Sequence, residues 1–176
     1  MYISQQNMVT KIISGGQSGA DMAALLAGSN LGIETGGYAP QKYMTEYGSN
    51  YDLKKYGLVE TKSSSYPYRT RLNVDNSDGT LVFRYKSSVG TDCTIGYAQT
   101  GQWKKGSIHN KSMYKPVCII TGLNDDDNVE LIKNFVNDNK INVLNVAGHR
   151  ESQSPFPNYT KYVENILCKA LDVQKN

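Results

Sequence analysis

The sequence contains few of the residues that build metal centres and disulfides. Its three cysteines, Cys93, Cys118 and Cys168, are odd in number and far apart, and their spacing fits neither a zinc site nor a redox pair. Its two histidines, His109 and His149, have no partners at metal-ligand spacing. This composition predicts reduced thiols, no bound metal and a cytoplasmic protein, with both histidines in surface or hinge positions.

Long apolar runs and dense clusters of one charge are also lacking. No stretch approaches the ~18 apolar residues that a membrane-spanning helix needs. We expect no signal peptide, because the start of the chain has no basic segment followed by an apolar run. The net charge is +3, and the nearest basic cluster, Lys104–Lys105, fits a solvated loop. We therefore expect neither a membrane nor a nucleic acid as a partner.

What is present indicates a globular α/β protein. The 176 residues, 39% of them hydrophobic, suffice for one domain with a substantial core, and we treat residues 1–176 as that domain. Strand-like and helix-like segments alternate, which predicts a mostly parallel sheet with helices on both faces. The expected strands are 9–14, 31–38, 58–61, 80–83, 116–120 and 141–146. The expected helices are 19–28, 69–74, 91–100, one starting near 124 and one starting near 158, with a further short helix possible within 40–56.

Three of these elements carry more specific expectations. The apolar run 116–120 is typical of a strand that is covered on both faces. In the helix 91–100, Cys93, Ile95 (or Gly96) and Ala98 are expected to face inward. The acidic run at 124–127 fits a helix start better than a metal site, because it lacks the spacing of a calcium loop.

The segment from Ile12 to Asp21 predicts a buried strand, a glycine loop and the start of a helix. Glycines let the backbone approach a ligand, and the first amides of a helix favour an anion. Ser18 and Asp21 have the spacing of a helix-capping pair. The pattern Gly15-Gly16-x-x-Gly19 lacks the alternating glycines of the dinucleotide fingerprint, and a tight turn without a ligand is the alternative.

A second glycine-bearing loop, from Ser87 to Thr94, also opens a predicted helix. In parallel sheets, ligands bind beyond the carboxyl ends of the strands, where the winding reverses direction. We expect the first strand to be central and to lie beside the strand at Leu81, which would bring the two loops face to face. Two helix starts at one crevice favour an anionic ligand over simple turns.

Polar residues near these loops are candidate ligand contacts. Arg150 follows a strand end and suits bidentate contact with a phosphate, although an ion pair with Glu151 or Asp78 is the alternative. Arg69 and Asn73 are one helical turn apart and face either the pocket or a neighbouring subunit.

Two further positions have open interpretations. Asp21 is either an acid at a helix start or an acceptor for a sugar hydroxyl. Tyr38 follows Gly36–Gly37 at a strand end, and it is the tyrosine we expect to stack on a flat ligand.

Several stretches occur in the order of a known family: 14–21, 32–38, 66–81, 90–94, Lys115–Pro116 and 144–152. In these residues the chain resembles the molybdenum cofactor carrier proteins. That family lies within the Rossmann-like nucleotide-binding superfamily, which includes the lysine-decarboxylase-like phosphoribohydrolases. The resemblance implies a Rossmann-like fold, a homo-oligomer (dimer or tetramer) and a pocket for a phosphorylated ligand. Molybdenum cofactor and a nucleotide-derived signal are examples of such a ligand.

The resemblance and the loop analysis together predict a set of ligand-binding residues. These are Gly15, Gly16, Gln17, Ser18, Gly19, Asp21, Gly37, Tyr38, Arg69, Asn73, Ser88, Gly90, Thr91, Thr94, Arg150 and Glu151. The chain also departs from the family. Met22 stands where the family usually has an arginine, which removes a cation near the expected pocket. Tyr38 replaces a frequent tryptophan, and His149 replaces a proline.

The phosphoribohydrolase motif Pro-Gly-Gly-x-Gly-Thr-x-x-Glu corresponds to residues 86–94. Gly90–Thr91 keeps the phosphate-binding part, but Thr94 occupies the position of the glutamate. A hydroxyl without a nearby base cannot replace that carboxylate at neutral pH. The leading hypothesis is therefore non-catalytic binding, as carriage or sequestration, of a phosphorylated nucleotide-like molecule.

Two other hypotheses remain from the sequence. One is a nucleotide N-glycosidase or phosphohydrolase that works through Asp92, Asp21 or Glu151. The other is an interaction module whose glycine loops are only turns.

Overall fold

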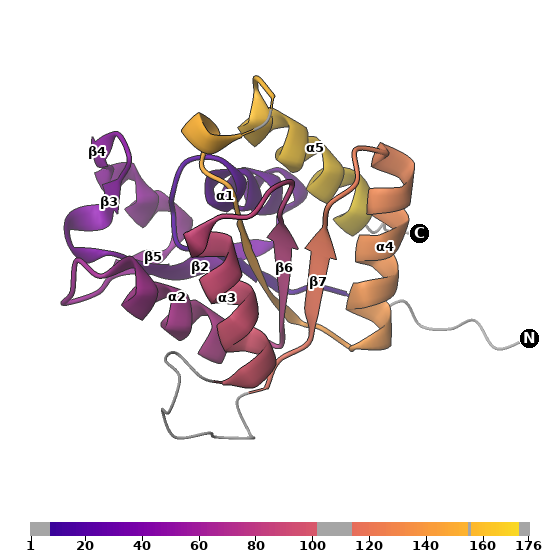
Figure 1. Ribbon diagram of the computed structural model, residues 1–176, viewed down its shortest axis with the longest axis horizontal. Coiled ribbons are helices and arrows are strands. Elements are labelled where there is room, and N and C mark those ends of the chain that lie inside the picture. Colours follow the sequence, from indigo (N-terminus) through magenta and orange to yellow (C-terminus); the bar gives the residue numbers. More distant parts are fainter. Residues whose placement is uncertain (1–7, 102–113, 155, 173–176) are drawn as a thin grey trace, which may run out of the picture.

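The computed structural model describes residues 8–101, 114–154 and 156–172, so the expectations for Lys104–Lys105 and His109 fall outside the described residues. Strands and helices alternate as predicted, and the described strands include a parallel sheet of six (Figure 1). The elements are β1 (Lys11–Ile13), α1 (Ala20–Leu31), β2 (Glu34–Ala39), η1 (Gln41–Tyr43), β3 (Met44–Thr45), β4 (Gly48–Ser49), η2 (Tyr51–Tyr56), β5 (Leu58–Glu60), α2 (Tyr66–Asp75), β6 (Gly79–Phe83), α3 (Val89–Thr100), β7 (Val117–Ile120), α4 (Asp125–Asp138), β8 (Val143–Gly148), η4 (Glu151–Gln153) and α5 (Tyr159–Leu171).

The strand order is β5-β2-β1-β8-β6-β7, and β3 and β4 form a separate two-stranded hairpin. β1 is central, but the expectation that it adjoins the strand at Leu81 is wrong, because β8 lies between them. Ile12 pairs with Leu144 of β8, and Val146 of β8 pairs with Leu81. The last strand therefore fills the position between the first strand and β6. Periodicity describes each strand by itself and contains no information about this order.

Helices cover both faces of the sheet (Figure 1). The largest core cluster joins α1, α4 and α5 to one face, and a smaller cluster of Val74, Tyr97 and Ala98 joins α2 to α3 on the other. The predicted closing helix is confirmed as α5, whose Val163, Ile166 and Leu167 are fully buried. None of the helices in the described ranges is long and apolar enough to cross a membrane.

Several predicted boundaries change in the structure. α1 continues to Leu31 and ends at Gly32, which has a positive φ of 68°, so the second strand begins at Glu34 rather than at residue 31. The segment 40–56 forms two short 3₁₀ helices with the β3–β4 hairpin between them. The start of α4 is confirmed, because Asn124 caps it by accepting hydrogen bonds from the amides of Asp126 (3.0 Å) and Asp127 (3.2 Å).

Of two predicted burial patterns, one is confirmed and one is wrong. β7 is an edge strand with helices on both faces: Cys118 and Ile120 are buried in the largest core cluster with α4, and Val117 packs, partly buried, against the smaller cluster of α2 and α3. In α3, the inward face carries Thr91, Thr94, Tyr97 and Ala98, and Cys93 is exposed. Of the residues expected to face inward, Ala98 is the buried one. The polar threonines, and not an apolar stripe, set the rotation of this helix.

Candidate functional site

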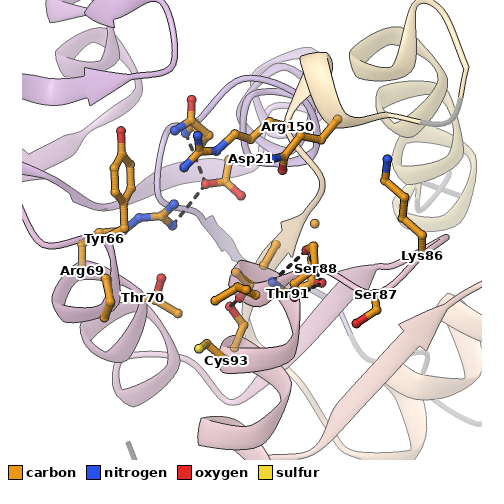
Figure 2. Close-up of a pocket in the computed structure, with 18 residues that line it drawn as sticks. Asp21, Tyr66, Arg69, Thr70, Lys86, Ser87, Ser88, Thr91, Cys93 and Arg150 are labelled. Atoms are coloured by element: carbon orange, nitrogen blue, oxygen red, sulfur yellow. Dashed lines mark hydrogen bonds and ion pairs between the residues drawn. The ribbon is translucent and has the colours of Figure 1, made fainter.

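A pocket of about 570 Å³ lies at the carboxyl ends of β1, β6 and β8. Its wall consists of the loop after β1, the face of α2, the start of α3 and the loop after β8 (Figure 2). The two glycine loops of the sequence analysis thus line one pocket, although β8 separates their strands. A volume in the range of ~300–1,000 Å³ is typical of small-molecule sites.

The start of α3 presents polar groups to this pocket. Ser88 caps the helix by accepting a hydrogen bond from the Thr91 amide (3.3 Å), and its hydroxyl lies 2.7 Å from the Thr91 hydroxyl. The amides of Val89 and Gly90 come before the first hydrogen bonds inside the helix. Val89 and Gly90 line the pocket, and a Cβ atom at Gly90 would meet no atom within 4 Å, so there is open space beside this helix start. The α3 start therefore has room and unpaired donors for an anion.

The start of α1 is different, because the protein's own acceptors occupy its amides. The Gln17 amide donates to Asp21 Oδ2 (3.2 Å), the Ser18 amide donates to Gln17 Oε1 (3.1 Å), and the Ala20 amide donates to the His149 carbonyl (3.1 Å). Gly19 is the capping residue, and α1 has no side-chain cap. The predicted Ser18–Asp21 capping pair is thus wrong, since Asp21 turns back onto the loop instead.

Asp21 forms a buried ion pair with Arg69 of α2. Arg69 Nη1 lies 3.2 Å from Asp21 Oδ2, and the two side chains are 12% and 5% exposed. Burial raises the pKa of Asp21 above its ordinary value, while the Arg69 guanidinium acts in the opposite direction. A Cβ atom at Gly15 would overlap the Arg69 guanidinium, so a side chain at this position would require Arg69 to move from its place beside Asp21.

Two further cations, Arg150 and Lys86, line the pocket from other elements (Figure 2). The Arg150 guanidinium lies 5.1 Å from the ring centre of Tyr66, and that of Arg69 lies 5.9 Å from the same ring. Within the described residues neither Arg150 nor Lys86 forms an ion pair. The predicted alternative, in which Glu151 or Asp78 neutralises Arg150, is therefore wrong.

Both of those acids are engaged elsewhere. Glu151 accepts hydrogen bonds from the amides of Tyr159 (3.0 Å) and Thr160 (2.8 Å) at the start of α5. Asp78 accepts from the amides of Asn142 (3.0 Å) and Val143 (2.8 Å). In the described part of the chain, Arg150 therefore has no carboxylate partner, and its guanidinium lies over the Tyr66 ring at the pocket wall.

The structure separates the predicted site residues into two groups. Those that line the pocket are Gln17, Asp21, Arg69, Ser88, Gly90, Thr91, Thr94 and Arg150. Those that lie outside its lining are Gly15, Gly16, Ser18, Gly19, Gly37, Tyr38, Asn73 and Glu151.

Residues of the second group make contacts that hold the wall in place. Asn73 ties α2 to β2, because its side chain accepts from the Tyr38 amide (2.8 Å) and donates to the Tyr38 carbonyl (3.0 Å). Ser18 donates to the Glu46 carboxylate and accepts from the Glu151 amide (3.2 Å). The two Ser18 bonds connect the β3–β4 hairpin, the loop after β1 and the loop after β8.

The sequence analysis missed several lining residues, among them Tyr66, Thr70, Lys86, Ser87, Cys93 and Gln153. A signal existed for two of these. Tyr66 precedes Arg69 by three residues and Thr70 by four, so Tyr66 is a neighbour of both on the surface of α2. Lys86 begins the segment that matches the phosphoribohydrolase motif, but its own side chain is not part of that pattern.

His149 is buried, with 1% of its surface exposed, and the prediction of a surface or hinge position is wrong. Its Nε2 atom accepts hydrogen bonds from the amides of Tyr85 (3.1 Å) and Lys86 (3.3 Å). Burial, followed by the positive charges of Lys86 and Arg84, lowers the pKa of His149. The neutral ring thereby fixes the backbone that carries Lys86.

Comparisons with known proteins agree with this architecture. A family model described as "Circularly permutated YpsA SLOG family" matches residues 12–171. A crystal structure from Syntrophus aciditrophicus SB, named "Putative molybdenum carrier protein", is 30% identical, covers 97% of this chain and 99% of its own, and superposes with a TM-score of 0.80. No curated protein matches the chain. The resemblance and the Rossmann-like α/β fold stated from the sequence are confirmed.

Proposed function

Because the chain belongs to the circularly permutated YpsA SLOG family, we propose that it binds a phosphorylated, nucleotide-like small molecule and carries or sequesters it unchanged. The observation that carries this proposal is the charge of the pocket. Arg69, Arg150 and Lys86 line it, whereas among the described lining residues Asp21 is the one carboxylate, and Arg69 already pairs with it. The surplus positive charge favours an anion.

The start of α3 is where we place the phosphate. The open amides at Val89 and Gly90 supply donors, and the helix dipole adds a partial positive charge. The unpaired Arg150 guanidinium faces the same pocket and can make charge-assisted, bidentate hydrogen bonds with a phosphate. The name of the Syntrophus structure makes molybdenum cofactor one candidate cargo, and a nucleotide-derived signal is another.

The carboxylates support binding without catalysis. Asp21 is paired, and Asp92 accepts hydrogen bonds from Arg84 (2.7 Å) and Ser87 (2.6 Å) outside the pocket lining. The hydroxyl of Thr94, which stands at the glutamate position of the phosphoribohydrolases, donates to the Gly90 carbonyl of its own helix (3.0 Å). All three groups already form hydrogen bonds within the protein, which argues against their use as the general acid or base that glycosidic cleavage requires.

Calorimetric titration with nucleoside 5′-monophosphates and the matching nucleosides tests the proposal. We expect a phosphorylated compound to bind while its nucleoside does not. Arg150→Ala should weaken binding by about tenfold or more, because it removes a charged hydrogen-bond donor. Arg71→Ala is the matched control, since Arg71 also stacks on a tyrosine of α2, Tyr68 (5.5 Å), but lies outside the pocket lining. Equal affinities of the two variants would contradict the proposal.

A second experiment separates carriage from catalysis. Nucleoside monophosphates incubated with the protein should be recovered intact by chromatography. Release of a free base or of ribose phosphate would show that the pocket transforms its ligand.

A further inference from the structure

One side chain of the pocket wall has an unsatisfied hydrogen-bond donor. Gln17 is only 5% exposed, and its Nε2 group has no hydrogen-bond partner among the described residues. Leaving a buried donor unpaired costs about 1–3 kcal/mol. Because Gln17 also lines the pocket, a bound molecule is the natural source of the missing acceptor.

The orientation of the Gln17 amide is fixed by its oxygen. Gln17 Oε1 accepts hydrogen bonds from the backbone amides of Ser18 (3.1 Å) and Glu46 (2.8 Å). A flip of the side chain would place an NH₂ group against two N–H donors, and both bonds would be lost. Nε2 therefore stays directed away from these amides, and Gln17 can offer a ligand a donor but no acceptor.

The neighbouring groups give the same character to this wall. Arg69 Nε is a second buried donor with no partner in the described parts of the chain. The nearby acceptor, Asp21, already receives hydrogen bonds from the Gln17 and Gly15 amides and from the Arg69 guanidinium. Figure 2 shows Asp21 and Arg69 on the side of the pocket opposite Lys86. This side of the pocket, called the Gln17 wall below, thus offers unpaired donors, while its carboxylate, Asp21, already accepts three hydrogen bonds.

We propose that the Gln17 wall recognises a carbonyl oxygen on the ring of the ligand, so that the pocket selects oxo-substituted heterocycles over their amino-substituted analogues. This inference rests on the proposed function, which places the phosphate of the same ligand at the start of α3. Gln17 Nε2 donates to the oxo group. An amino group in its place would set donor against donor and leave both without a partner.

Inosine 5′-monophosphate and adenosine 5′-monophosphate are suitable probes, because one has an oxo group and the other an amino group at ring position 6, together with the matching change at N1, which carries a hydrogen only in inosine. Calorimetric titration of the full chain should show inosine monophosphate binding at least about tenfold more tightly than adenosine monophosphate. Gln17→Glu replaces the donor by an acceptor of the same shape, and it should reverse that order of affinities.

Gln153→Glu is the matched control for charge. Gln153 lines the same pocket but belongs to η4 and is exposed, whereas Gln17 is buried. We expect this variant to weaken the binding of both nucleotides alike, through charge repulsion, and to keep the wild-type ratio. Thermal melting checks that each variant is folded. The comparison of the two nucleotides on the wild-type protein tests the inference even if a variant does not fold.

The outcomes separate the two proposals. Equal affinities of wild-type protein for the two nucleotides, or the same ratio in Gln17→Glu as in wild type, would overturn the Gln17 inference and leave the proposed function standing. Tighter binding of adenosine monophosphate by wild type would also overturn it. Failure of both nucleotides to bind would contradict the proposed function, and the inference with it.

Discussion

At the scale of single residues, the site depends on the ion pair between Asp21 and Arg69. Both side chains are nearly buried, and the guanidinium lies over Gly15 in space that a methyl group would fill. A buried charge that loses its partner is strongly destabilising. A substitution at Gly15 would therefore disturb this pair and, with it, the conformation of the loop after β1.

Gly15→Ala tests this dependence. We expect a loss of about 3 kcal/mol or more in the free energy of unfolding, because the displaced Arg69 leaves Asp21 buried and unpaired. Gly96→Ala is the control, since a Cβ atom at Gly96 in α3 would meet no atom within 4 Å; that change should be neutral or slightly stabilising. Urea denaturation measures both variants, and equal stability would show that the space over Gly15 does not matter.

His149 predicts a pH dependence of stability. Its pKa is lowered in the folded state, by burial and then by Lys86 and Arg84, with Asp92 opposing. As the pH falls below the ordinary histidine value of about 6.5, the unfolded chain takes up a proton that the folded chain excludes. Stability should therefore fall between pH 7 and pH 5, and fall less in His149→Gln. Parallel pH profiles of wild type and variant would contradict the assignment.

At the scale of elements, adjacent residues in the loop after β8 have different tasks. Glu151 holds the first turn of α5 through the amides of Tyr159 and Thr160, whereas Arg150 faces the pocket. The chain thereby couples the closing helix to the pocket wall through one short 3₁₀ turn, η4.

Exchanging these residues for alanine should separate stability from binding. Glu151→Ala should lower the free energy of unfolding by about 1 kcal/mol, the usual effect of losing a helix cap, and leave ligand affinity nearly unchanged. Arg150→Ala should weaken ligand binding and leave the free energy of unfolding nearly unchanged. Denaturation and calorimetric titration of both variants check this, and a large loss of affinity in Glu151→Ala would restore its predicted role as a ligand contact.

Local sequence patterns predicted the elements better than their arrangement. The apolar spacing of α5 and the Asn124 cap of α4 are properties of short segments, so both could be predicted. The rotation of α3 could not, because its buried face carries Thr91 and Thr94 rather than apolar residues. The pairing of β8 with β6 also has no local signal, since strand order depends on how the crossovers pack.

For the site, too, local sequence patterns predicted some features and could not predict others. Glycine spacing located the two loops, but it could not reveal that Asp21 occupies the amides of the first one. Tyr66 could have been found from its spacing to Arg69, whereas the role of His149 as a buried acceptor depends on a contact with the distant Tyr85–Lys86 backbone.

At the scale of the whole molecule, the sheet order brings four distant segments to one pocket. Because β8 lies between β1 and β6, its exit loop places Arg150 among groups from the first half of the chain. Glu46 links these parts, since it accepts from Ser18 of the first loop and from Ser152 of the last. The pocket is therefore a product of topology, and its positive charge is the feature on which the proposed function depends.

The most direct test of that function uses the cysteines as reporters. Cys93 is exposed and lines the pocket, while Cys168 is partly buried on α5 and lies outside its lining. Alkylation of each thiol, followed by mass spectrometry, is measured with inosine monophosphate, adenosine monophosphate and their nucleosides. We predict that a nucleotide slows the alkylation of Cys93 in wild type, that Arg150→Ala needs at least about tenfold more nucleotide for the same slowing, and that Cys168 is unchanged. An unchanged Cys93 rate with every compound, or equal slowing in Arg150→Ala, would contradict the account.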